Sequence, residues 1–169
     1  MINPYQWRPA THSDIGDIAR LSKAHLGLYA EGEAVFAERI RLAPEGCFVL
    51  ANHRRVVGYF FSHPWARAKP PALHQMLGAI PPEADCWYVH DVAVDEAARG
   101  GGVVAEVCER ALDAARAKGY RAAMLVAVSG AGSYWRRLGF VDATTDALRA
   151  KLKDYGDDAV YMERDLSGT

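Results

Sequence analysis

The stretch HDVAVDEAARGGGV, residues 90–103, decides the fold. Its first residues belong to an apolar, β-rich run that begins at Cys86. Its last residues begin a segment with helical spacing that reaches Lys118. Three successive glycines cost conformational entropy, so Gly100–Gly102 indicate a sharp turn or a close approach to a ligand. The N-terminus of a helix with no side chains in the way is an anion site. The stretch therefore predicts a strand, a glycine turn and a helix whose first N–H groups bind an anion.

The segments around this stretch predict a mixed sheet. The continuous apolar run 121–128 is typical of a strand covered on both faces, and it would pair in parallel with 86–94. Two β-rich runs at 46–52 and 55–63 predict an antiparallel hairpin. Further elements are expected as helices near 13–26, 33–42 and 130–139, and as strands near 5–9, 140–143 and 159–164. We expect one α/β domain over 1–169, with six or seven mostly antiparallel strands, helices on both faces and one splayed parallel pair.

Residues 64–85 form a long connection that holds five of the eight prolines. Connections of this length are usually functional loops or disordered segments, and one helical turn is expected near 73–77. The polar segment between 143 and 159 is expected to be an irregular connection.

The composition limits the function. A chain of 169 residues suits one domain, and a net charge of −1 gives no general attraction to nucleic acid or to a membrane. No secretory signal and no apolar run of membrane-spanning length is visible. The three cysteines are far apart and lack metal-ligand spacing, so we predict reduced thiols, no metal and a cytoplasmic protein, with a homodimer as one option.

The glycines also fit a second pattern, because Gly100 to Ala105 satisfy G-x-G-x-x-A, the fingerprint of dinucleotide-binding domains. That pattern needs the turn directly after the strand and an acid at the end of the next strand. Here five residues lie between Val94 and Gly100, and the next strand ends at Val128-Ser129 without an acid. A nicotinamide-dependent oxidoreductase is therefore the weaker alternative, and a loop without a ligand is another.

The stretch resembles motif A of the GNAT superfamily of acyl-CoA-dependent N-acyltransferases, where a strand precedes [R/Q]-x-x-G-x-[G/A] and a helix. Arg99 and Gly102 match this motif, and Val104 replaces its last small residue. WRPATHSDIGDIARL at 7–21 is similar to the family's first strand and helix. YWRRLGF at 134–140 and YGDDAVYMER at 155–164 are similar to its last helix and final strand. The resemblance covers most of the chain.

The resemblance implies an N-acetyltransferase that moves an acetyl group directly from acetyl-CoA to a primary amine on a small molecule or a peptide. An acyl-CoA-binding module without turnover is the alternative. The pantetheine arm would pair with the backbone of the motif strand, and the pyrophosphate would bind the glycine turn. The expected coenzyme-binding residues are Val92, Ala93, Val94, Arg99, Gly100, Gly101, Gly102, Val103, Val104, Ala105 and Trp135.

His90 is the candidate general base, since amine acetylation requires removal of a proton. Strand alternation would place His90 on one face with Tyr88, Val92 and Val94, and Asp91 on the other. Histidines on this strand help to remove the amine proton in the arylalkylamine branch of the family, and Tyr88 stands where other members carry a glutamate or a second histidine. A structural, hydrogen-bonded histidine is the alternative.

Tyr134 is the candidate acid for the leaving thiolate. The family often carries a tyrosine at the position that Trp135 occupies here, and Tyr134 is its neighbour. Ser129 or Ser133 would replace a family asparagine. An aromatic and apolar set is expected near the acceptor: Leu28, Tyr29, Phe36, Phe61 and Trp65. The other histidines are expected to have surface roles: His12, His25, His53, His63 and His74.

Overall fold

The computed structural model of the chain describes residues 3–168. Seven strands form one sheet in the order β1-β2-β3-β4-β5-β7-β6. Every neighbouring pair is antiparallel except β4 and β5, which are parallel. The strands are β1 Gln6–Pro9, β2 Cys47–Ala51, β3 Val56–Trp65, β4 Cys86–Val94, β5 Ala122–Ala127, β6 Val141–Asp142 and β7 Val160–Asp165. The predicted mixed α/β sheet with one parallel pair is confirmed.

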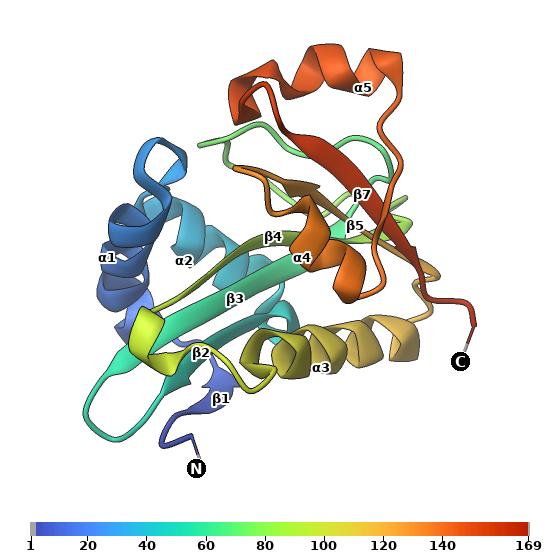
Figure 1. Cartoon of the computed structure of the whole chain (residues 1–169). Coiled ribbons are helices and arrows are strands. Elements are labelled where there is room, and N and C mark those ends of the chain that lie inside the picture. The colour runs from blue at the N-terminus through green and yellow to red at the C-terminus, as the bar shows by residue number, and fades with distance from the viewer. Residues whose placement is uncertain (1–2, 169) are drawn as a thin grey trace.

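Helices cover both faces of the sheet (Figure 1). The helices are α1 Ile15–Leu26, α2 Glu33–Leu42, α3 Val103–Ala117, α4 Gly132–Arg137 and α5 Asp146–Lys151. Trp87, Val89 and Leu125 pack with the buried side of α3 and with Trp135 of α4. On the opposite face, Tyr59 and Phe61 pack with α1 and α2, and a separate cluster around Tyr88 and Met124 packs with α5.

The amphipathic α3 forms where its sequence pattern predicts. Val107, Cys108, Ala111, Leu112 and Ala115 are buried on one side at helical spacing. Gly102 precedes the helix and Gly119 follows it, and both have positive φ angles. The helix therefore begins at the glycine turn and presents its free N–H groups at the carboxyl end of β4.

Two sequence expectations are wrong. The 143–159 connection contains α5, which begins at Thr145, whose side-chain oxygen accepts a hydrogen bond from the Leu148 N–H. No regular helix forms near 73–77. Two charged side chains of α2 fix that segment instead. Glu38 accepts hydrogen bonds from backbone N–H groups of the segment, and Arg39 donates one to a backbone carbonyl.

Candidate functional site

The glycine turn exposes a row of backbone donors. Gly100, Gly101 and Gly102 have φ angles of +98°, +64° and +74°, all in the left-handed region that favours glycine. A Cβ added to any of them would meet open space, so the turn faces a free volume. Within residues 3–168, the N–H groups of Gly101, Gly102, Val104 and Ala105 make no hydrogen bond to another backbone group. Gly102 and Val104 border a cavity of about 410 Å³, which Gly100 and Arg99 also line. Free N–H groups at a helix N-terminus suit a phosphate.

The paired part of β4 and β5 is short. Trp87–Val89 pair with Ala123–Leu125, but β4 runs on to Val94 while the end of β5 pairs only with β7. The strands diverge from there, so the edge of β4 at Val92, Ala93 and Val94 has no β5 partner. This opening leads from the glycine turn into the molecule, and it holds the backbone groups that the resemblance assigns to the pantetheine arm.

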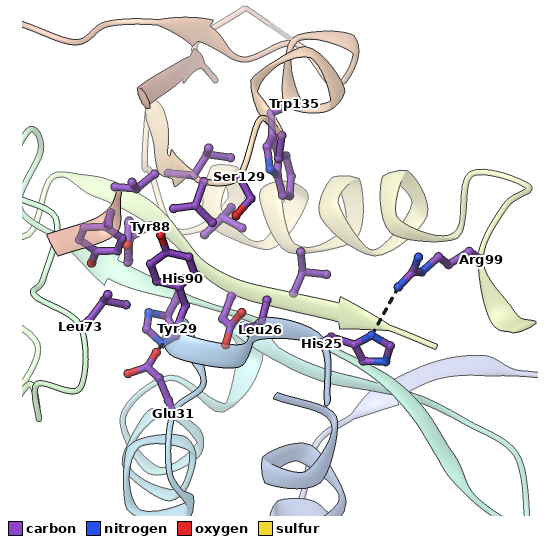
Figure 2. Close-up of a pocket in the computed structure, with 18 residues that line it drawn as sticks. His25, Leu26, Tyr29, Glu31, Leu73, Tyr88, His90, Arg99, Ser129 and Trp135 are labelled. Carbon is purple, nitrogen blue, oxygen red and sulfur yellow. Dashed lines mark hydrogen bonds and ion pairs between the residues drawn. The ribbon is translucent and has the colours of Figure 1, made fainter. Parts of the chain in front are cut away.

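A larger cavity of about 610 Å³ lies at this opening. Figure 2 shows Trp135 and Ser129 on one side of it, with His90 and Glu31 on the other. Tyr29 lines it at the segment that links α1 and α2, and Arg99 and His25 lie at one end. The two cavities share His25, Leu26, Val92 and Arg99, which makes them neighbours along the same route.

A β-bulge sits at His90. Phe61 pairs with Asp91 and Ser62 with Val89, so His90 has no partner residue on β3. The extra residue reverses the alternation beyond this point: Val92 and Val94 pack on the α3 side, while Tyr88 lies on the opposite face. The expectation that His90 shares a face with Val92 and Val94, and that Asp91 points away from it, is therefore wrong. His90 and Asp91 both reach the same cavity.

His90 has an acidic partner that the sequence did not suggest. Its Nε2 lies 2.6 Å from Oε1 of Glu31, and the two side chains are 6% and 2% exposed. Burial alone would raise the pKa of Glu31, but the contact with His90 and the nearby Arg39 guanidinium hold the pKa of this carboxyl below its usual range. Glu31 is a lone acid between two helices, and no sequence pattern marks it.

Asp91 is the second carboxylate of the cavity. It accepts a hydrogen bond of 2.9 Å from the Tyr59 hydroxyl, and burial raises its pKa to about 6. Ligand atoms of Glu31, His90 and Asp91 lie within 4.8 Å of one another. Two ligands of a tetrahedral zinc ion lie about 3.4 Å apart, given bonds of about 2.1 Å. The 2.6 Å contact between Glu31 and His90 is shorter, so these two groups fit an ion pair better than a shared metal.

The neighbours of His90 are aromatic and buried. Tyr88 is 2% exposed, and burial first, then Tyr155, raises its pKa well above the usual range. His63 is fully buried with its ring 6.1 Å from that of His90, and burial lowers its pKa to about 3. His63 is therefore neutral at pH 7, and the expectation of a surface role is wrong. Tyr88 borders the cavity, as a protonated hydroxyl.

The candidate acid and its neighbour line different cavities. Trp135 borders the large cavity, whereas Tyr134 borders the smaller one beside Val92, Val94 and Val104. Partial burial raises the pKa of Tyr134, so its hydroxyl keeps its proton at pH 7. Of the two serines considered, Ser129 borders the large cavity.

Arg99 and His25 lie where the two cavities meet. Arg99 Nε donates to the Val94 carbonyl at 2.8 Å, and one of its terminal nitrogens lies 3.4 Å from Nδ1 of His25. The other His25 ring nitrogen is 2.7 Å from Asp95. His25 was expected at the surface, but it borders both cavities. Its position on the last turn of α1 beside the β4 end could not be read from the sequence.

Only one member of the expected acceptor set borders the cavity. Tyr29 does so, while Phe36 and Phe61 are fully buried in the core beneath α1 and α2. Trp65 packs beside the cluster under α5, and Leu28 is 94% exposed. The part of the cavity around His90 is therefore lined by other residues, above all Glu31, Asp91, Leu73 and Tyr155.

Comparisons with known proteins give the family. The sequence matches the acetyltransferase (GNAT) family over residues 13–140, and the chain belongs to this family. A comparison with curated proteins finds no match. Among residues 3–168, no helix is long and apolar enough to cross a membrane.

Solved structures share the fold. The loading GNATL domain of CurA from Lyngbya majuscula superposes with a TM-score of 0.79 at 14% identity, covering 98% of this chain and 99% of that one. The GphF GNAT-like decarboxylase in complex with isobutyryl-CoA superposes with a TM-score of 0.75 at 18% identity, and the match covers 95% of this chain and 99% of that one. Arabidopsis thaliana Naa50 in complex with the bisubstrate analogue CoA-Ac-MVNAL superposes with a TM-score of 0.69 at 13% identity, and the match covers 95% of this chain and 98% of that one. Structural neighbours thus include acyl-CoA complexes, N-acetyltransferases and a decarboxylase.

Proposed function

We propose that this chain is an acetyl-CoA-dependent N-acetyltransferase that acts on a primary amine. The observation that carries the proposal is the continuous route from the free N–H groups at the glycine turn described above, along the open edge of β4, to the buried His90. In the proposal the pyrophosphate binds the glycine turn and the pantetheine arm lies against Val92–Val94. The thioester then lies beside the bulge.

Transfer is direct and needs no covalent enzyme intermediate. The amine nitrogen bonds to the thioester carbonyl carbon as the carbon–sulfur bond breaks, His90 takes the amine proton, and Tyr134 donates a proton to the departing thiolate. The three cysteines are buried and free, and burial raises the pKa of each thiol, so none is suited to act as a nucleophile. Reduced thiols also suit the cytoplasm, where we place the protein.

The test is release of CoA thiol from acetyl-CoA with a panel of small amines and peptide N-termini. We expect release that depends on the amine. Binding of acetyl-CoA without release by any amine favours the alternative of an acyl-CoA-binding module. Stabilisation by NAD in a thermal-shift assay, with none by acetyl-CoA, would contradict both. Because one structural neighbour is a GNAT-like decarboxylase, the panel includes a carboxyacyl-CoA without amine. If CO₂ is released from the carboxyacyl-CoA and no amine is acetylated, the reaction is decarboxylation and the proposal is wrong.

A further inference from the structure

The Glu31 carboxylate uses both of its oxygens, and they contact different parts of the molecule. One oxygen lies 2.6 Å from His90 Nε2. The other accepts a hydrogen bond of 3.2 Å from the backbone N–H of His74, in the connection between β3 and β4. The Glu31 N–H in turn donates to the buried Ser22 hydroxyl of α1 at 3.0 Å, which fixes the backbone that carries the carboxylate. A single side chain therefore joins the candidate base to the connection 66–85, named the acceptor loop below.

The acceptor loop is held by two more charged side chains that follow Glu31 in the chain. Glu38 accepts hydrogen bonds from the N–H groups of Leu77 and Gly78 at 2.6 and 3.1 Å. Arg39 is fully buried, contacts Glu38 at 2.8 Å and donates to the Gln75 carbonyl at 3.1 Å. A proline-rich loop without regular structure thus has its middle fixed by buried charges, and its Leu73 borders the large cavity beside His90.

From these contacts we propose that Glu31 is a positioning residue that sets the His90 ring and the acceptor loop together. The inference rests on the proposed function, in which His90 takes a proton from an amine that the loop helps to bind. The carboxylate orients the ring, stabilises its protonated form and fixes the loop at His74. Glu38 contacts the loop and Arg39 rather than the ring.

Other groups facing His90 cannot replace this carboxylate. From its own strand, Tyr88 keeps its proton. Asp91 also attracts a charged ring, but burial raises its pKa to about 6 and its carboxylate bonds to Tyr59, so it is the weaker partner. From β3, His63 is neutral. From α2, the Arg39 guanidinium lies beside Glu31 and stabilises that carboxylate. Loss of the Glu31 charge would therefore leave the imidazolium form less stable, and a base would keep its activity to lower pH.

Three matched substitutions separate the roles: Glu31→Gln, Glu38→Gln and Glu33→Gln. Glu33 is exposed in the first turn of α2 and serves as the control for the loss of one carboxylate in this segment. For Glu31→Gln we expect kcat to fall about 10–100-fold and the acid limb of kcat/KM to move by about one pH unit to lower pH. Glu38→Gln should raise the KM of the acceptor and leave the acid limb unchanged. Glu33→Gln should match the wild type.

A second measurement needs no acceptor, so it separates this inference from the proposed function. The ring resonances of His90 are followed against pH by NMR in the wild type and in Glu31→Gln, with a His90→Gln spectrum for assignment. We expect the titration midpoint of the ring to fall by about one unit in Glu31→Gln. An unchanged midpoint in folded protein would overturn the inference, whatever the enzyme assay shows. A shifted midpoint without turnover on any amine would support it and count against the proposed function alone.

Discussion

The two ends of the cavity are built in different ways. At the proposed coenzyme end the candidate ligand groups are backbone N–H groups of one short segment, Gly100–Ala105, and its three glycines face open space. At the acceptor end they are side chains from distant segments, and Glu31, His90 and Asp91 come together only in the folded chain. A backbone site depends on local conformation, so sequence alone can reveal it. A side-chain site depends on packing and register.

Substitution at the glycine turn tests the proposed coenzyme end, where we expect a loss of binding rather than a slower reaction. Gly102→Asp places a carboxylate beside the free N–H groups and adds a side chain at a φ of +74°. We expect acetyl-CoA affinity to fall at least about 100-fold, or ~2.7 kcal/mol, measured by titration calorimetry. Gly119→Asp is the matched control, because Gly119 follows the same helix at a φ of +92° and also faces open space. Gly119→Asp should lose at least as much stability, because its carboxylate lies at the negative end of the helix dipole. Normal acetyl-CoA binding by folded Gly102→Asp would contradict the assignment of the coenzyme end.

Removal of the candidate base tests the acceptor end. His90→Ala should lower kcat/KM by about 10²–10⁴, because proton removal from the amine loses its acceptor. Acetyl-CoA affinity should change little, since the glycine turn is untouched. Steady-state kinetics and calorimetry on the same preparation check both statements. Wild-type turnover in His90→Ala would contradict the role of His90 as the base and leave it a structural role.

Tyr134 sharpens the comparison because it borders the smaller cavity beside the glycine turn, whereas His90 borders the large cavity. Tyr134→Phe removes only the hydroxyl. If Tyr134 donates the proton to the thiolate, we expect kcat to fall about 10–100-fold in this variant, with little change in the KM of acetyl-CoA. The paired variant Trp135→Phe changes the wall of the large cavity and should act mainly on the acceptor KM. Full kcat in folded Tyr134→Phe would exclude the role.

The smallest expected effect concerns stability at the acceptor end. Burial raises the pKa of Asp91 to about 6, so the folded chain holds this proton more tightly than the unfolded chain does. Stability from this group is present below pH ~4 and is lost as pH rises to ~6. Asp91→Asn should therefore stabilise the protein by roughly 1–3 kcal/mol at pH 8 and by much less at pH 4. Thermal unfolding at the two pH values checks this, and an equal gain at both would contradict it.

The same difference explains what the sequence could predict. The strand, the glycine turn and α3 follow from local pattern, and the mixed sheet follows from the order of apolar runs. His90 was identified by its strand, but one inserted residue in the β3–β4 register changed which neighbours share its face. Glu31, His25 and the buried His63 carry no local signal, because their roles depend on packing between segments far apart in the chain. The short α5 was missed because its polar sequence is held mainly by its cap and by Leu148.

The most direct test of the central claim follows a labelled acetyl group in a single turnover. The protein is mixed with a stoichiometric amount of acetyl-CoA that carries a ¹³C-labelled carbonyl, together with an amine that supports thiol release, and the products are analysed by mass spectrometry. The account predicts one labelled acetyl group on the amine for each CoA released, with transfer lost in Gly102→Asp and slowed in His90→Ala. Release of CoA with the label in free acetate, or in a stable acetyl-protein adduct, would contradict direct transfer in this cavity.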